Sequence, residues 1–355
     1  MTTQSSSGAP SMALLIDTLL PDAAPTVIAD EGAPKSWAPM PRIGGNRRVT
    51  ERIRAIITGV RTTARPVDVL VGPRASHRLR VTATPLVGPS GNVHAVWLWA
   101  GEPDAPPPVP RSAAAFEWSS TSRLITLGRK LTNDEAEPAI AGRLTLTAPE
   151  VFRYITQLDD AMTLIAKALE PVPEDRWEGI ATLDTPHGQR TVHLGMRSMP
   201  APAQQCWRGV LHDVTDTVKP APLTLHALAH SALTARGGPS ALALMDLRQA
   251  RIVSWLTDPV PGIAWKGVVD NRDTPPPEDV VRIFQAFGQL RDGAEQVHIP
   301  SVRLRRLAGG WTTVDAHCTI VPGTKPLVAV VELTPIPLNS QGRPSQAIGR
   351  DRAGR

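Results

Sequence analysis

One succession of predicted elements occurs three times along the chain at intervals of about 100 residues, and this repeat limits the fold more than any other feature. Each copy opens with two short strands joined by a turn. Alternating or β-branched apolar runs bounded by turn residues predict these strands. The expected pairs are residues 13–19 with 26–29, 114–118 with 123–127, and 241–247 with 251–256.

A helix follows in each copy after a segment of variable length. Apolar residues recur there at the 3.6-residue spacing of a helix with one buried face. Proline and acidic residues precede two of the three helices, as is typical of a first helical turn. The spacing predicts helices over residues 49–60, 151–169 and 280–290.

Strands joined by turns close each copy. The alternation is plainest in the third copy, where Val302 and Leu304 face one way and Arg303 and Arg305 face the other. We expect these arginines to pair with Asp315 across the hairpin. The closing strands are expected at residues 77–87 and 93–100, at 177–183, 190–197 and 206–214, and at 302–305, 313–320 and 327–334.

This order of elements predicts an α+β fold with three consecutive domains, each a five-stranded antiparallel sheet with helices packed on one face. Proline-rich segments at residues 102–110 and 219–222 are typical of extended linkers. The predicted domains are residues 1–106, then 107–222, then 223–338, where a linker helix over 223–236 precedes the third sheet. Residues 339–355 lack apolar periodicity and predict a disordered basic tail.

The charge distribution argues against a nucleic-acid partner. The net charge is +5, but the tail carries four arginines against one aspartate and so holds three of these charges. The remaining body is nearly neutral, unlike a nucleic-acid-binding surface. The sequence has no apolar run long enough to span a membrane and no signal-peptide pattern at its start, so we expect a cytoplasmic protein. Two distant cysteines predict no disulfide framework.

Local motifs resemble those of GAF and PAS sensor domains. Residues 208–216 (RGVLHDVTD) are similar to the G-x-x-x-D-[IV]-T ending of many PAS domains. In the third copy, residues 265–267, 277–279 and 309–311 resemble the PAS succession of a bulky residue with glycine, a helix-starting acidic pair and G-x-W. The chain departs from that pattern at residues 274–277, where Thr-Pro-Pro-Pro stands in place of His-Pro.

The order across nearly the whole chain resembles an actinobacterial, chiefly mycobacterial, family of sensor-domain-only proteins with one GAF-like and two PAS-like domains. Residues 14–19, 99–105 and 256–261 carry this likeness. The resemblance implies signal integration and scaffolding without a known ligand, and it implies that the first domain is the GAF-like one.

These observations predict a non-enzymatic sensor or scaffold that passes signals to protein partners, because the three domains leave no residues for an output module. The phosphate-loop, dinucleotide-binding, zinc-protease and serine-hydrolase motifs are absent from the sequence. Two alternatives stay open. The protein could be a pure interaction scaffold whose pockets are closed by side chains, or an enzyme with a site that these motifs do not describe.

A small-molecule ligand is expected to contact aromatic residues of the third domain, namely Trp255, Trp265, Phe284 and Trp311. The sequence names no cofactor. His226 and His230 have the spacing of two metal ligands on one helix face, but two ligands make a weak site and a solvated helix is favoured. Cys206 and Cys318 are expected to be small buried residues, so no metal or catalytic residue is predicted.

Overall fold

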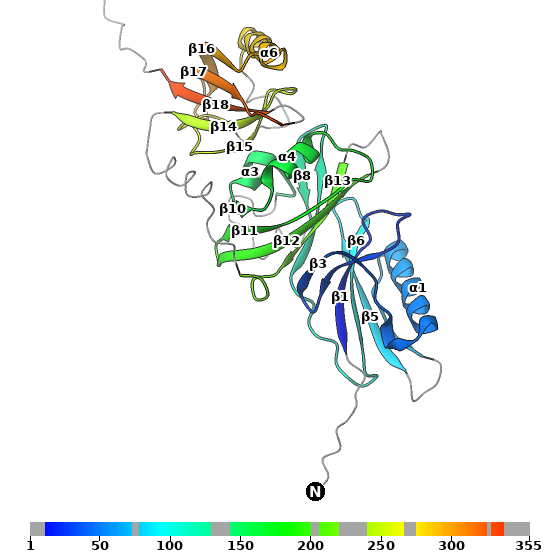
Figure 1. The fold of residues 1–355 in the computed structure, drawn as a ribbon. Coiled ribbons are helices and arrows are strands. Elements are labelled where there is room, and N and C mark those ends of the chain that lie inside the picture. The colour runs from blue at the N-terminus through cyan, green and yellow to red at the C-terminus, as the bar shows by residue number, and fades with distance from the viewer. Residues whose placement is uncertain are drawn as a thin grey trace, which may run out of the picture.

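The structure is a computed structural model, and it describes residues 11–72, 78–128, 143–199, 206–219, 240–265, 275–324 and 328–336. Within these residues the strands form three separate antiparallel sheets, with few helices (Figure 1). We call each sheet with its helices a unit, numbered first, second and third in chain order. The predicted linker helix with His226 and His230, and the predicted tail at 339–355, lie outside the described residues.

The first sheet contains six strands in the order β3-β2-β1-β6-β5-β4. Helix α1 covers one face of it and begins at Asn46, whose side chain accepts a hydrogen bond from the Arg48 N–H. Thr50, one turn further along, instead donates its hydroxyl hydrogen to the Asn46 carbonyl. The elements are β1 (Met12–Asp17), β2 (Thr26–Asp30), β3 (Ala33–Pro39), a 3₁₀ turn (Ile43–Gly45), α1 (Arg47–Thr63), β4 (Val67–Val71), β5 (Leu79–Val87) and β6 (Val93–Gly101).

The second sheet contains seven strands in the order β10-β11-β12-β13-β7-β8-β9. Two short helices lie on one of its faces (Figure 1). The elements are β7 (Ala113–Ser119), β8 (Leu124–Leu127), β9 (Thr145–Thr147), α3 (Ala148–Phe152), β10 (Ile155–Leu158), α4 (Ala161–Leu169), β11 (Arg176–Thr185), β12 (Gly188–Ser198) and β13 (Cys206–Asp213).

The third sheet contains five strands in the order β15-β14-β18-β17-β16, with helix α6 on one face. Pro276 precedes this helix, and Glu278 and Asp279 lie in its first turn, where the helix dipole favours negative charge. The elements are β14 (Ala241–Asp246), β15 (Arg251–Trp255), α6 (Pro277–Arg291), β16 (Gln296–Arg305), β17 (Trp311–Ile320) and β18 (Val328–Pro335).

One arrangement of five strands is common to the three sheets. In each unit the first strand lies between its hairpin partner and the last strand of the unit. The shared orders are β2-β1-β6-β5-β4, β8-β7-β13-β12-β11 and β15-β14-β18-β17-β16. The repeat in the sequence is therefore a repeat in strand topology.

The prediction of five strands per sheet is correct for the third sheet and wrong for the other two. Strand β3 adds an edge to the first sheet, and strands β9 and β10 extend the second sheet at both edges. The prolines of β3 are Pro34 and Pro39, and an edge strand tolerates proline because one side of it needs no ladder hydrogen bond.

The single helix predicted over residues 151–169 is also wrong. Helix α3 ends at Phe152, strand β10 follows, and α4 begins only at Ala161. Asp160, directly before α4, has a left-handed backbone conformation with φ of 46°, which no continuous α-helix contains. The apolar residues on both sides of this break happen to keep helical spacing.

The units stack in layers, so that helices and sheets follow one another as α1, first sheet, second sheet, α3 and α4, third sheet, and α6 (Figure 1). The first and second sheets meet face to face through Leu15, Ala95 and Val210. By contrast, α4 of the second unit packs Ile165 and Leu169 on the outer face of the third sheet. Thus the second unit contacts one neighbour through its sheet and the other through its helices.

Buried histidines line the contact between the first and second sheets. His193 and His212 are paired across β12 and β13 with their ring centroids 5.2 Å apart. Neither ring nitrogen of His212 has a hydrogen-bond partner among the described residues. Burial lowers the pKa of His193 to about 4 and that of His212 to about 3, so both are neutral at pH 7.

The predicted pairing of Arg303 with Asp315 is replaced by pairing with the first turn of α6. Arg303 donates from Nε to Asp279 at 2.8 Å and from Nη2 to Glu278 at 2.5 Å. Asp315 accepts instead from the Ser301 N–H at 2.8 Å. Because α6 packs beside β16, the buried carboxylate of Asp279 on the helix pairs with Arg303 in preference to the half-buried Asp315 across the hairpin.

No helix in the described ranges combines the length and the apolar character that crossing a membrane requires.

Candidate functional site

A cavity of about 320 Å³ lies in the third unit, between its sheet and α6, where the second unit closes one side. This volume is within the range of small-molecule sites. Helix α3 packs beside the edge strand β15, so that residues 147–149 of the second unit reach the wall of the cavity. Two units therefore share one cavity.

Most of the cavity wall is apolar. Ile283 and Phe287 of α6 face residues of the inner side of the third sheet across it. The sheet contributes Ile299, Val302, Leu304, Ala316, Cys318, Val331 and Leu333. These side chains belong to the core of the third unit, and the alternation of β16 to β18 places them on a single face.

The second unit is filled differently in the corresponding place. Trp118, Trp177 and Trp207 are all buried between its sheet and α4, together with Phe116. Such large rings occupy much of the volume between a small sheet and its helices. The second unit therefore uses aromatic rings as core.

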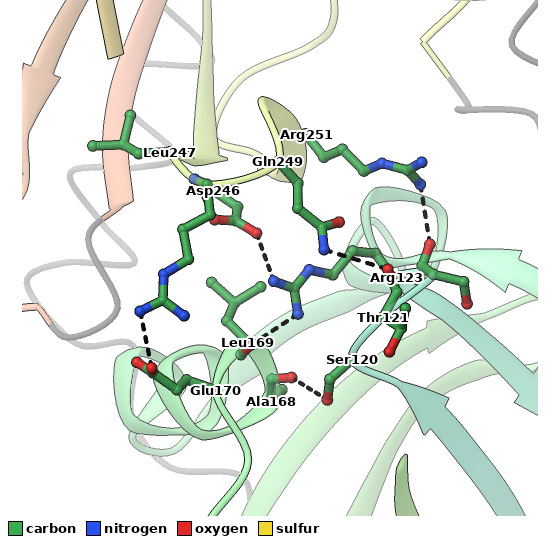
Figure 2. A network of polar contacts seen from close by, with 12 residues as sticks. Ser120, Thr121, Arg123, Ala168, Leu169, Glu170, Asp246, Leu247, Gln249 and Arg251 are labelled. Atoms are coloured by element: carbon green, nitrogen blue, oxygen red, sulfur yellow. Dashed lines mark hydrogen bonds and ion pairs between the residues drawn. The ribbon is translucent and has the colours of Figure 1, made fainter. Parts of the chain in front are cut away.

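The polar side chains that line the cavity include three arginines and a glutamine. Arg123 comes from the turn after β7, whereas Gln249 and Arg251 come from the β14–β15 hairpin (Figure 2). Arg305, the third arginine, ends β16 and lies over the ring of Trp311 at 5.6 Å. The described lining residues include no carboxylate and no histidine.

Arg123 links the second unit to the third. It donates from Nη2 to Asp246 at 2.7 Å and from Nη1 to the Leu169 carbonyl at 2.9 Å (Figure 2). Both Arg123 and Asp246 are buried. Burial lowers the pKa of Arg123, although the carboxylate of Asp246 opposes this effect. The Nε of Arg123 has no partner among the described residues.

The hairpin of the third unit makes three further polar contacts with the second unit (Figure 2). Arg251 donates to the Ser122 carbonyl at 3.0 Å, and Gln249 donates to the Thr121 carbonyl at 3.3 Å. Arg248, which does not line the cavity, forms an ion pair with Glu170 at 2.9 Å. The junction next to the cavity is therefore held mainly by side chains of one hairpin.

The four aromatic residues predicted to contact a ligand have different positions. Trp265 lines the cavity, and Trp255 contacts the edge of Trp265 with centroids 6.1 Å apart. Phe284 is 40% exposed and Trp311 is 38% exposed, and neither lines the cavity. Helical periodicity alone does not distinguish Phe284 from Phe287, the neighbouring aromatic residue that faces inward.

Sequence reasoning missed the contribution of the second unit to the cavity. Arg123 and Trp265 are 142 positions apart in the sequence, and no local pattern connects them. The one sequence signal that could have identified Arg123 is its place in the turn after the first strand of its unit. Arg123 lies in the turn between β7 and β8, directly before β8 begins at Leu124.

Cys318 lines the cavity, but its thiol is not a reactive group. Burial raises the pKa of Cys318 to about 12 and that of Cys206 to about 11, so both thiols are protonated at neutral pH. The cysteine side chains therefore act as small apolar groups. Cys318 is buried as predicted, whereas Cys206 is only half-buried. Across the described ranges, no three side chains of His, Cys, Asp or Glu are grouped as metal ligands.

These features define a mixed α/β protein of several antiparallel sheets and few helices, with an apolar cavity where two units meet. Residues 13–109 match the family model described as Rv3651-like, N-terminal. No curated protein matches the chain.

A solved structure extends the match to nearly the whole chain. It is a crystal structure of an uncharacterized protein from Mycobacterium tuberculosis, with 20% sequence identity and a TM-score of 0.75 over 92% of this chain and 96% of that one. The likeness shows a shared fold, and together with the family model it supports a relationship to a mycobacterial family.

Two other solved structures are similar only at a low level. An RNA-binding Light-Oxygen-Voltage receptor has 12% identity and a TM-score of 0.25, over 63% of this chain and 95% of that one. The Escherichia coli DhaR(N)-DhaL complex has 9% identity and a TM-score of 0.18, over 57% of this chain and 79% of that one. Scores this low carry no argument about this chain.

Proposed function

We propose that this protein is a non-enzymatic sensor with a GAF-like first unit and PAS-like second and third units. A small molecule binds in the cavity of the third unit and changes how that unit is held against the second. A protein partner then reads this change. The protein works in the cytoplasm, where Cys206 and Cys318 stay reduced.

The shared cavity carries this proposal. Its wall includes Arg123, and Arg123 also holds Asp246 at the junction of the two units. A ligand can shift the balance between two arrangements only by its difference in affinity for them. A molecule that contacts both units has such a difference, because separating the units removes part of its site.

The chemistry of the lining supports binding rather than catalysis. The ionisable groups on it are arginines and the protonated thiol of Cys318. Neither group exchanges protons readily at neutral pH. An enzyme that performs acid–base chemistry would need a group with a pKa near 7 at this place.

A scaffold role is favoured for the second unit by one observation. Its buried tryptophans occupy the space between its sheet and its helices. The third unit therefore binds the ligand and moves, and the second unit is the rigid body relative to which it moves.

Native mass spectrometry of the full chain, purified without denaturant, tests the proposal. We expect a retained small molecule in the natural protein. Ala316→Leu, which fills the cavity, is expected to abolish retention, and Cys318→Met serves as a second filling variant should the first fail to fold. Ala55→Leu, at an exposed position of α1, is the control. A bare polypeptide mass for the natural protein would contradict sensing and favour the pure scaffold.

A further inference from the structure

The geometry points to an apolar molecule with one carboxylate as the ligand, its acidic group next to Arg251 and Arg123 and its apolar body between α6 and the third sheet. This inference rests on the proposed function, since it names the class of molecule that the sensor takes. It is carried by how charge is distributed along the cavity wall.

The body of the cavity suits an unbranched or narrow apolar chain. The walls contributed by α6 and the sheet are formed mainly by aliphatic residues and Phe287, and Trp265 adds a ring from the segment after β15. A volume of about 320 Å³ lies near the lower end of the range for small-molecule sites, so a chain of about ten carbon atoms is a suitable probe. Polar groups along such a chain would lose their hydrogen bonds to water without replacement.

The end of the cavity at the second unit has an excess of positive charge. Asp246 neutralises Arg123 at 2.7 Å, but Arg251 has no ion-pair partner in the described part of the chain. Burial is the main cause of the lowered pKa of Arg123, and repulsion from Arg248 and, to a smaller extent, from Arg251 adds to it. Arg248 is paired with Glu170, whereas Arg251 is not paired with a carboxylate among the described residues. A bound anion would relieve this repulsion.

Hydrogen-bond donors are available at the same end. Arg251 uses Nη1 on the Ser122 carbonyl, which leaves other N–H groups of its guanidinium for a ligand. Gln249 carries a second amide hydrogen besides the one it donates to the Thr121 carbonyl. Planar guanidinium groups bind carboxylates through paired hydrogen bonds.

The opposite end of the cavity is less suited to an acidic group. The strand register places Arg251 beside Asp246 at one end of the third sheet and Arg305 beside Trp311 at the other. The guanidinium of Arg305 lies over the Trp311 ring, and this contact satisfies part of its charge. The acidic group is therefore assigned to the Arg251 end.

Calorimetric titration of the full chain with decanoate and with 1-decanol tests the inference. The two probes have the same chain length and differ in charge. We expect decanoate to bind at least about tenfold more tightly, as a charged hydrogen bond implies. Arg251→Gln is expected to reduce decanoate affinity about tenfold and to leave decanol affinity within about twofold. Arg251→Lys, which keeps the charge, should restore part of the difference.

Arg248→Gln is the matched control. Arg248 lies on the same hairpin and also bonds to the second unit, but it does not line the cavity. This variant should therefore keep the preference for decanoate. Equal losses in Arg248→Gln and Arg251→Gln would overturn the inference, because they would show a general effect of loosening the junction.

The remaining outcomes separate the ligand class from the proposed function. Equal affinity for both probes, or binding of decanol alone, overturns the carboxylate and leaves sensing intact. If the natural protein retains a molecule without a carboxylate and binds neither probe, the carboxylate is again overturned and sensing is left intact. If neither probe binds and the natural protein carries nothing, the ligand class and the sensor function both fail.

Discussion

Asp17 and Asp246 occupy the same position in two different sheets, and each accepts a hydrogen bond from an arginine of the second unit. Both residues end the first strand of their unit. One carboxylate oxygen accepts from the backbone N–H two residues further on, at 2.8 Å for Asp17 and 2.9 Å for Asp246. The other accepts from Arg197 at 2.9 Å or from Arg123 at 2.7 Å.

This symmetry makes the Asp17–Arg197 pair a test of how the first two units are joined. Burial raises the pKa of Asp17 in spite of the opposing effect of Arg197, and the desolvation of a buried ion pair can outweigh its attraction. We expect Arg197→Met to lower the free energy of unfolding by about 3–5 kcal/mol, because it leaves a buried carboxylate unpaired. The double variant Asp17→Leu with Arg197→Met should recover most of this loss.

Urea unfolding of the single and double variants measures these values. Glu51→Gln, which breaks the exposed pair with Arg47, is the control and should cost less than about 1 kcal/mol. A double variant as unstable as Arg197→Met would show that the pair contributes net stability.

The buried histidine pair predicts a loss of stability in acid. In the folded protein the pKa values of His193 and His212 are about 4 and about 3, whereas an imidazole in the unfolded chain has a pKa of about 6.5. Below about pH 6.5 the unfolded chain takes up protons that the folded protein refuses, so the stability present above this pH is lost as pH falls. Each histidine then costs about 1.4 kcal/mol per pH unit.

Replacing His212 by phenylalanine should reduce this acid sensitivity, because phenylalanine takes up no proton. The substitution breaks no hydrogen bond of the ring among the described residues. Between pH 6.5 and pH 4.5 we expect the variant to lose about 2 kcal/mol less than the natural protein. His317→Phe, in the exposed stacked pair with His298, controls for the same substitution at another cross-strand pair. The burial argument is refuted if both variants lose stability equally on acidification.

Two glycines should respond in opposite ways to alanine. Gly209 pairs with Phe116 across β13 and β7, and a Cβ at this position would overlap the Phe116 ring. Gly209→Ala should therefore cost about 1–3 kcal/mol through overpacking. Gly59 lies on α1 with open space around it, so Gly59→Ala should stabilise the protein by about 1 kcal/mol. Thermal unfolding of both variants measures these changes. A higher melting temperature for Gly209→Ala, or a lower one for Gly59→Ala, would contradict the prediction.

The two thiols should react slowly while the protein is folded. With a pKa of about 11, Cys206 is almost entirely protonated at pH 8, and Cys318 is still less ionised. We expect alkylation by iodoacetamide to be about a hundredfold faster after unfolding in guanidinium chloride. Mass spectrometry of the alkylated peptides gives each rate, and rapid labelling of Cys318 in the folded protein would show that its site opens readily.

The repeated element order could be predicted from sequence because each unit repeats local signals. Alternation and turn residues located the central strands and helices α1 and α6, which the structure confirms within a few residues. The extra edge strands could not be predicted, since β3 contains Pro34 and Pro39 and β9 has only three residues. Edge strands depend on a neighbouring strand for half of their bonding, and local sequence does not report that neighbour.

The cavity was only partly predictable for the same reason. Trp265 was identified by its place in a local motif, but Arg123 enters the cavity from another unit. Likewise Arg303 pairs with the buried Asp279 of α6, whereas the hairpin pattern predicted pairing with Asp315. In both cases long-range packing decides which charges meet.

The order of the layers also determines which units can influence each other by direct contact. The space between α1 and the first sheet faces away from the second unit, because the opposite face of that sheet is the one in contact. The buried residues of this core all belong to the first unit, so a change there would reach the second unit only through the strands of the first sheet. In the part of the chain that the structure describes, the cavity of the third unit does have a neighbour's side chains in its lining, so its contents contact the second unit directly.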